Sequence, residues 1–184
     1  VLAGLGVSLC FLLTAWAVGR DAQAHGAASL TLVAPGLADR TCLPLLMRLG
    51  IAAWAVLAPR RPFAIPLEDE ALFTAHSPMQ AYLREDPWRL HFATARLMLV
   101  SKLLDRRLAR APDGAIRMPT TLLLARNDRI IDNARCEAIV CRLAGQRAAV
   151  LKLDGEHSLE FEPDPSPLHR ALVESLAAAE RAEA

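Results

Sequence analysis

Residues 118–132, MPTTLLLARNDRIID, join a short apolar run to a polar turn. An apolar run of this length, bounded by a proline and by charged turn residues, is typical of a strand buried in a parallel sheet. We therefore predict a strand over 119–125, followed by a turn that carries Asp128. Asp132 and Asn133 come after the turn and are suitable N-caps for the helix that follows.

Two similar apolar runs flank this region. SLTLVA at 29–34 ends at a Pro-Gly pair, and AAVLKL at 148–153 leads into an Asp-Gly-Glu-His turn that contains His157. Both runs predict buried strands, with helices over about 134–144 and from 167 onward.

The first eighteen residues, VLAGLGVSLCFLLTAWAV, form a long apolar stretch that contains Gly6 and Ser8. We interpret it as a strand that turns sharply at Gly6-Val7-Ser8 and continues as a helix, which would expose Ser8 on the turn. Backbone N–H groups at such a helix start can stabilise an oxyanion. Two other interpretations stay open: a membrane span, because eighteen uncharged residues are long enough, and an ordinary buried strand and helix.

Outside one long insertion, the predicted strands and helices alternate. Alternation of this kind indicates an α/β fold with a mostly parallel sheet and helices on both faces. Sites on such sheets lie at the carboxyl ends of the strands, and Ser8, Asp128 and His157 all fall there. We therefore expect these three side chains to share one edge of the sheet, in the chain order serine, acid, histidine.

Four stretches of the chain resemble the α/β-hydrolases, in particular their lysophospholipase and monoacylglycerol-lipase-like branch. They are GVSLC at 6–10, VAPGL at 33–37, MPTTLLLARNDRIID at 118–132 and LDGEHSLEFE at 153–162. The last two are the most specific, because a strand with an aspartate and then a Gly-x-His turn 29 positions later is seldom met outside this fold. The resemblance implies the C-terminal two-thirds of the α/β-hydrolase fold, N-terminally incomplete.

By this resemblance Ser8 would be the nucleophile, His157 the general base and Asp128 the acid that orients the histidine. The backbone N–H of Leu9 would supply one oxyanion-hole donor, and no metal or organic cofactor is expected. Cys10 stands where the family usually has a glycine, and the strands that normally bring the second oxyanion-hole loop are not in this sequence. Two alternatives stay open, Asp128 as a helix-capping turn residue and His157 as a surface histidine.

Residues 37–110 interrupt the alternation with helical periodicity, broken by prolines and without strand-like alternation. We predict that 37–110 form a helical cap on a hydrolase core made of 1–36 and 111–184. We interpret the histidines other than His157 as structural, namely His25, His76, His91 and His169.

The first helix of the insertion, over about 43–59, is apolar on more than one face. This pattern favours a substrate-binding role for Trp54, Leu46 and Met47 along an acyl chain, or a patch that touches a lipid surface. Burial of both faces between the cap and the sheet explains the same pattern equally well.

The composition is that of one globular domain, with 184 residues, 53% of them hydrophobic, and a net charge of +1. Basic residues form no stripe with interleaved aromatics, so we expect no nucleic-acid partner. The four cysteines form no C-x-x-C pair and have no histidine at metal-ligand spacing. Free thiols in a reducing, cytoplasmic compartment are the simplest interpretation.

Together these features predict a serine hydrolase that cleaves carboxylic esters of hydrophobic substrates, such as lysolipids or monoacylglycerols. A transient contact with a membrane surface is expected, and the oligomeric state is left open. Two alternatives remain: an acyltransferase or amidase that uses the same triad, and a non-catalytic fragment or binding module with an open sheet edge.

Overall fold

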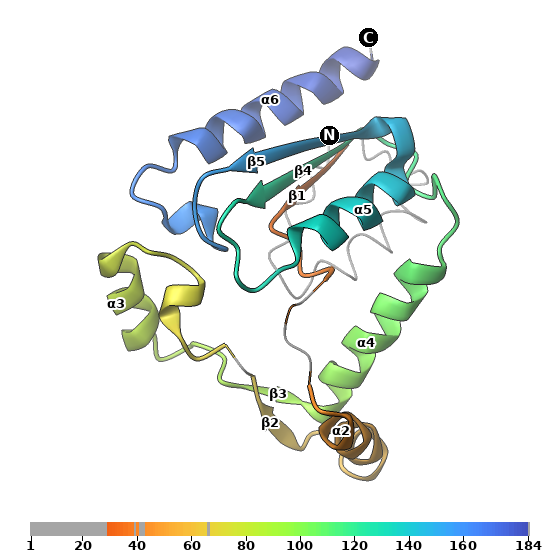
Figure 1. The fold of residues 1–184 in the computed structure, drawn as a ribbon, viewed down its shortest axis with the longest axis vertical. Helices are drawn as coiled ribbons and strands as arrows, with labels where there is room; N and C mark the ends of the chain where they lie inside the picture. Colours follow the sequence, from red (N-terminus) through yellow and green to blue (C-terminus); the bar gives the residue numbers. More distant parts are fainter. Residues whose placement is uncertain (1–28, 39, 41–42, 66, 184) are drawn as a thin grey trace.

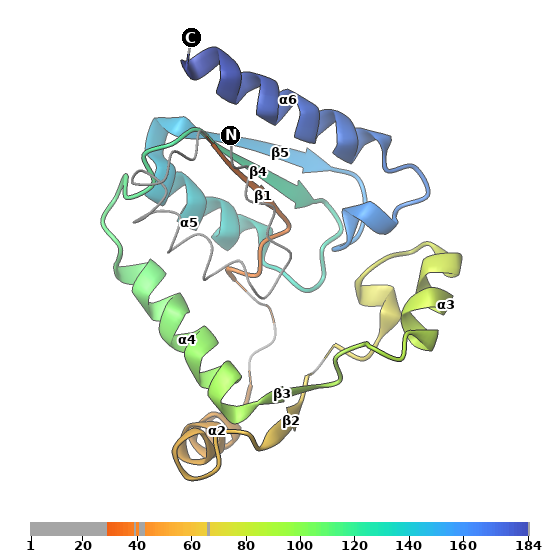
Figure 2. The ribbon, with the colours of Figure 1, turned by 180° about the vertical axis from the view of Figure 1, so that it is seen from behind.

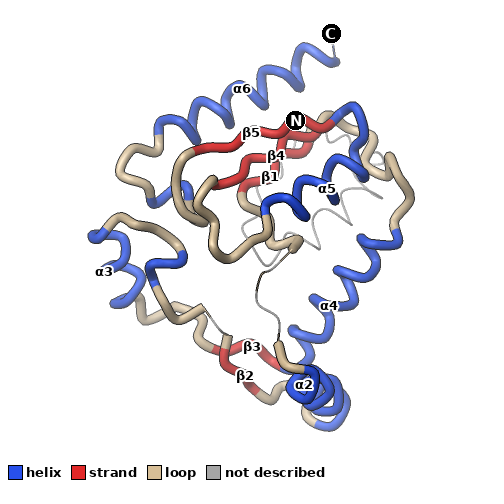
Figure 3. Tube along the Cα trace, in the orientation of Figure 1, coloured by secondary structure: helices blue, strands red, loops and turns tan. Residues whose placement is uncertain are grey.

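The computed structural model describes residues 29–38, 40, 43–65 and 67–183 (Figure 1). Figure 3 distinguishes its helices, strands and loops. The strands are β1 (Leu30–Val33), β2 (Pro62–Ala64), β3 (Phe92–Thr94), β4 (Thr120–Ala125) and β5 (Ala148–Leu153). The α-helices are α2 (Leu45–Leu57), α3 (Ser77–Glu85), α4 (Ala95–Arg110), α5 (Asn133–Ala144) and α6 (Ser166–Glu183). Three short 3-10 helices are η1 (Glu70–Leu72), η2 (Gly145–Arg147) and η3 (Leu159–Phe161).

The main sheet of the described residues is parallel, with the strand order β1-β4-β5. Its register pairs Leu30 with Thr120 and Ala125 with Leu153, so all three strands run toward the same edge. The three strands predicted from their apolar runs are confirmed. The expected α/β class with a mostly parallel sheet is confirmed as well.

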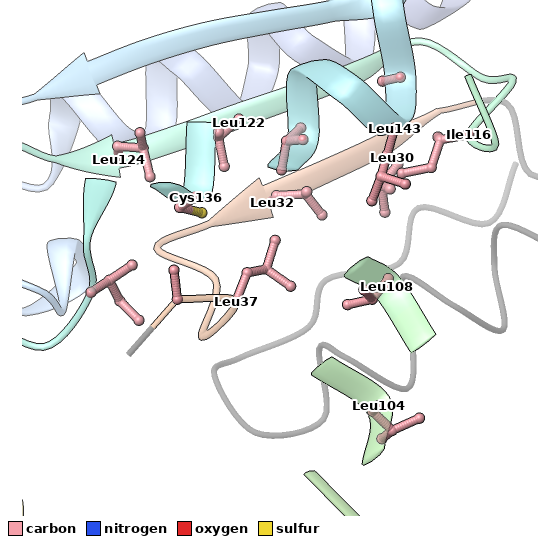
Figure 4. Close-up of a cluster of buried hydrophobic side chains, with 14 of the residues drawn as sticks. Leu30, Leu32, Leu37, Leu104, Leu108, Ile116, Leu122, Leu124, Cys136 and Leu143 are labelled. Carbon is pink, nitrogen blue, oxygen red and sulfur yellow. The ribbon is translucent and has the colours of Figure 1, made fainter. Parts of the chain in front are cut away.

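Helices cover both faces of this sheet (Figures 1 and 2). Side chains alternate along β4, so Leu122 and Leu124 face the cluster that includes α5, whereas Leu123 and Ala125 face α6. Figure 4 shows the first cluster, in which the sheet packs against α5 and the second half of α4. The central position of β4 explains its continuous apolar sequence, because a strand covered on both faces has no solvated side.

The insertion contains two strands that the helical pattern did not predict. β2 and β3 pair antiparallel, with Phe63 opposite Ala93, and form a separate two-stranded sheet. The expectation that no strand interrupts this region is therefore wrong. Each strand has three residues, too few for alternation to show, and the partners meet only after the chain has made a long excursion.

The helices of the insertion pack in two directions. α2 packs against α4, with Ile51 as the buried residue of α2. Leu104 and Leu108 of α4 join the core cluster beneath the main sheet. The division into a core of 1–36 and 111–184 and a cap of 37–110 stays a prediction. None of the described helices combines the length and the apolar character that crossing a bilayer demands.

The start of α5 shows how local sequence positions the core. Asp132 is the N-cap, and its carboxylate accepts a hydrogen bond from the backbone N–H of Arg135 at 3.1 Å. Asn133, the other expected cap, lies inside the helix and donates from Nδ2 to the carbonyl of Ala125 at 2.7 Å. Cys136, one turn further on, is fully buried against the sheet.

We predict that the thiol of Cys136 makes stability depend on pH in alkaline solution. Burial raises the pKa of this thiol from its ordinary value of 9.0 to about 12, and nearby carboxylates add to the effect. Between these values the unfolded chain has lost the proton that the folded chain retains. The free energy of unfolding should therefore fall by up to about 1.4 kcal/mol per pH unit.

The free energy of unfolding is measured by urea titration at several pH values, from below pH 9 upward. It should fall more steeply with pH in the wild type than in Cys136→Ala. Cys141→Ala is the matched control, because it removes an exposed thiol from the same helix. A wild-type slope equal to that of Cys136→Ala would contradict the prediction.

Candidate active site

The carboxylate of Asp128 is the most constrained group at the carboxyl edge of the sheet. Asp128 lies in the turn that follows β4, and its side chain is completely buried. Oδ1 accepts hydrogen bonds from the backbone N–H groups of Ile130 and Ile131, both at 2.8 Å. The two bonds hold the carboxylate in one orientation and direct Oδ2 toward the loop after β5.

His157 lies in that loop, and its Nδ1 is 2.8 Å from Oδ2 of Asp128. A carboxylate accepts hydrogen bonds, so Nδ1 carries the proton and donates a hydrogen bond to Asp128. This leaves Nε2 as the reactive nitrogen. The ring of Phe73 packs edge-on to the imidazole, with centroids 6.2 Å apart. This arrangement fixes both the tautomer and the orientation of the histidine.

The two loops meet because the β4–β5 ladder continues beyond the strands. The N–H of Arg126 donates to the carbonyl of Leu153 at 2.8 Å, and the N–H of Asn127 donates to that of Gly155 at 3.0 Å. Parallel neighbours thus extend their pairing into the turns that carry Asp128 and His157. The juxtaposition is a direct consequence of the strand order.

Gly155 shapes the turn before His157. Its φ of 144° is one that residues with a Cβ rarely adopt. A Cβ there would also lie 2.9 Å from Cγ and Cδ of Glu162. Glu162 is needed in this place, because its Oε1 accepts the backbone N–H of Glu156 at 2.9 Å.

The insertion docks on the same histidine loop. The N–H of Ser158 donates to the carbonyl of Phe73 at 2.8 Å. The carbonyl of Phe161 accepts hydrogen bonds from Oγ1 of Thr74 at 3.3 Å and from Nδ1 of His76 at 3.2 Å. The expectation of a structural role for His76 agrees with this contact.

Arg129, the residue after Asp128, is a further link that the sequence did not single out. Its guanidinium donates to the carbonyl of Ala71 in η1 and lies 3.7 Å from the carboxylate of Glu156. Its side chain therefore connects the acid turn, the histidine loop and the insertion. No local signal in the sequence could reveal contacts between positions so far apart.

The other predicted site residues lie elsewhere or outside the described residues. Ser8 and Leu9 belong to the segment 1–28, outside the described residues, as does the open question of a membrane span over 1–18. Leu46, Met47 and Trp54 lie on α2, where Leu46 is 83% exposed. The guanidinium of Arg61 stacks over the Trp54 ring, 4.0 Å from its centroid. The catalytic and substrate-binding roles of all these residues stay predictions.

Within the described ranges, no group of three or more His, Cys, Asp or Glu side chains is placed to hold a metal ion. The candidate site is therefore a buried pair of aspartate and histidine at the carboxyl edge of a parallel sheet. Such a pair can accept a proton at Nε2 and stabilise the resulting imidazolium.

No protein-family model matches the chain, and its sequence matches no curated protein. Solved structures do match. A monoacylglycerol lipase from Paleococcus ferrophilus superposes with a TM-score of 0.80 at 18% identity, over 94% of this chain and 66% of its own. A soluble variant of monoglyceride lipase from Saccharomyces cerevisiae, in complex with a substrate analogue, gives a TM-score of 0.77 at 14% identity, over 94% and 63%.

A structure of the metagenome-derived lipolytic enzymes LipS and LipT gives a TM-score of 0.57 at 16% identity, over 96% of this chain and 63% of that one. The chain therefore has the α/β-hydrolase fold, with an architecture like that of monoglyceride lipases, as the four sequence stretches predict. It spans slightly less than two thirds of the length of these relatives.

We predict that Gly155→Ala disturbs the histidine loop. The new Cβ would displace Glu162 and remove its hydrogen bond to Glu156, in addition to straining the backbone. The free energy of unfolding should fall by about 2–3 kcal/mol, as measured by urea unfolding.

Gly114→Ala is the matched control. Gly114 also has a positive φ, of 70°, but nothing lies within 4 Å of its added Cβ. Gly114→Ala should lower the free energy of unfolding by only about 1 kcal/mol, which is the cost of the backbone conformation alone. An equal fall in the free energy of unfolding of the two variants would show that the contact with Glu162 does not contribute to stability.

Proposed function

We propose that this protein is a serine hydrolase that cleaves carboxylic esters of hydrophobic substrates. The observation that carries the proposal is the hydrogen bond from Nδ1 of His157 to the buried carboxylate of Asp128. This hydrogen bond lies at the edge of the sheet where we also predict Ser8, at the end of the strand expected within residues 1–18. The α/β-hydrolase fold supports this placement.

In the proposed mechanism Oγ of Ser8 attacks the acyl carbonyl while Nε2 of His157 takes its proton. Asp128 keeps the imidazole in the required tautomer and stabilises the imidazolium. The N–H of Leu9 donates to the oxyanion, and the histidine then protonates the leaving alcohol. A water molecule, activated by the same histidine, releases the acid and restores Ser8. These steps use no metal or organic cofactor.

The proposed substrates are monoacylglycerols or lysolipids. The structural neighbours that are named as monoacylglycerol and monoglyceride lipases support this class. The exposed leucines of α2 support it too, because an apolar helix on the surface suits a lid that meets lipid. In this proposal Trp54, Leu46 and Met47 contact the acyl chain, and the insertion touches a lipid surface transiently.

A fluorophosphonate probe tests whether Ser8 is an activated nucleophile. We expect covalent labelling of the wild-type chain at Ser8 and none of Ser8→Ala, as read by mass spectrometry of the labelled peptide. Ser101→Ala is the matched control, because the hydroxyl of Ser101 only donates to a carbonyl within α4. A folded wild-type chain that stays unlabelled would favour the non-catalytic binding module.

Exchange of the acid tests the role of Asp128. Asparagine can still accept the two N–H bonds through Oδ1, but its amide would donate to Nδ1 and leave the proton on Nε2, the wrong tautomer. Asp128→Asn should therefore lower kcat for a soluble ester by on the order of 10⁴-fold while the chain stays folded.

Asp132→Ala is the control for this exchange, because it removes a helix cap close to Asp128 without touching His157. It should cost about 1 kcal/mol of stability and leave kcat unchanged. The reverse pattern would assign the acid to Asp132.

A further inference from the structure

The turn that carries Asp128 is held from outside as well as from within. Within the turn, the backbone N–H groups of Ile130 and Ile131 donate to Oδ1 of the carboxylate. The carbonyl groups of the same two residues both accept hydrogen bonds from Arg40. Arg40 lies between β1 and α2, so a distant part of the chain binds the turn that orients the acid.

Arg40 binds this turn with its backbone and with its side chain. Its backbone N–H donates to the carbonyl of Ile130 at 2.9 Å. Nε of its guanidinium donates to the carbonyl of Ile131, also at 2.9 Å. Beside them, the N–H of Asp132 donates to the carbonyl of Ala38 at 2.8 Å. Three hydrogen bonds therefore join the segment after β1 to residues 130–132.

Two consecutive peptide groups transmit these contacts to the carboxylate. The first joins Ile130 to Ile131: its N–H donates to Asp128, and its carbonyl accepts the N–H of Arg40. The second joins Ile131 to Asp132, and its carbonyl accepts the guanidinium of Arg40. Because a peptide group is planar and stiff, a shift at its carbonyl also moves its N–H. Both peptide groups are thus fixed on two sides.

The guanidinium of Arg40 has this turn as its partner. Among the described residues, no carboxylate lies at ion-pair distance from it. Ile131 is only 1% exposed, so its carbonyl is costly to leave unpaired, whereas Arg40 itself is exposed. A charged donor also makes a stronger hydrogen bond to a carbonyl than a neutral donor does.

Arg129 attaches the same turn to a second segment that lies outside the main sheet. Its guanidinium donates to the carbonyl of Ala71 in η1. Arg40 precedes α2 in the chain, and Ala71 follows β2. The turn that carries the acid is therefore bound by two separate parts of the region between β1 and α3.

We propose that Arg40 is a positioning residue for the pair of Asp128 and His157. Its guanidinium holds the peptide group after Ile131, and the turn thus held directs Oδ2 of Asp128 toward Nδ1 of His157. Arg40 acts through the backbone of the turn and not on the reacting atoms. The inference rests on the proposed function, in which Asp128 keeps the imidazole in the required tautomer.

The first measurement compares the hydrolysis of p-nitrophenyl butyrate by the wild type, Arg40→Met and Arg40→Lys. Arg40→Met keeps an unbranched side chain but removes its donors. It should lower kcat about 10- to 100-fold, because a catalytic group that is slightly misplaced loses much of its effect. KM should change less than about twofold, since substrate binding is not altered. Arg40→Lys should recover part of the loss, because an ammonium can still donate but lacks the fixed geometry of a guanidinium.

The second measurement reads the tautomer of His157 directly, from the ¹⁵N chemical shifts of its ring in alkaline solution, where the ring is neutral. Loss of the His157 signals in His157→Gln assigns them. The wild type should carry the proton on Nδ1, as the hydrogen bond to Asp128 requires. In Arg40→Met a substantial fraction should carry it on Nε2, because the carboxylate is no longer held in place.

Arg147→Met is the matched control. Arg147 is also exposed and the change in net charge is identical, but it precedes β5, at the opposite end of the sheet from the turn. Both kcat and the tautomer of His157 should stay as in the wild type. Equal losses of kcat in Arg147→Met and Arg40→Met would trace the effect to net charge and overturn the proposal.

A wild-type kcat and a wild-type tautomer in Arg40→Met would also overturn the proposal, even if the free energy of unfolding falls, because the contact would then only stabilise the fold. The two proposals fail in different ways. If the wild type has its proton on Nδ1 but does not hydrolyse esters, the proposed function fails, and the tautomer in Arg40→Met still decides the role of Arg40. A wild-type ring protonated on Nε2 would overturn both.

Discussion

A buried carboxylate is costly unless every one of its oxygens is hydrogen-bonded, and this constraint organises the carboxyl edge of the sheet. Asp128 meets it with two backbone N–H groups on Oδ1 and one imidazole N–H on Oδ2. The backbone donors belong to Ile130 and Ile131, which are themselves core residues, so the turn cannot shift without opening the core. The position of His157 is therefore tied to the hydrophobic packing of the domain.

The same histidine loop is also where the insertion joins the sheet. Hydrogen bonds from Ser158, Thr74 and His76 cross between the two, and two of them end on the carbonyl of Phe161. Arg129 adds a bond from the acid turn to η1. Because these links are mostly to backbone carbonyls, they constrain the path of the chain more than the identity of the side chains, and they hold this end of the insertion against the turns that carry Asp128 and His157.

The features that were predicted correctly from the sequence are those that depend on neighbouring residues or on strand order. The runs at 29–34, 119–125 and 148–153 are continuous apolar segments bounded by turn residues, and each became a strand. The pairing of Asp128 with His157 followed from placing both turns at one sheet edge. The β2–β3 pair was missed because three-residue strands show no period, and the contacts of Arg129 were missed because they join residues 58 positions apart.

The insertion has two chemically different ends, and their separation follows from where its charges fall. Within residues 40–110 the first acidic residue is Glu68, beside η1, and Glu70 is paired there with Arg89 on the side that docks on the sheet edge. Its exposed leucines lie on α2, at the far end of the molecule from that edge (Figure 1). Charge pairing therefore stabilises the end of the insertion that meets the histidine loop, whereas α2 is held through its packing on α4.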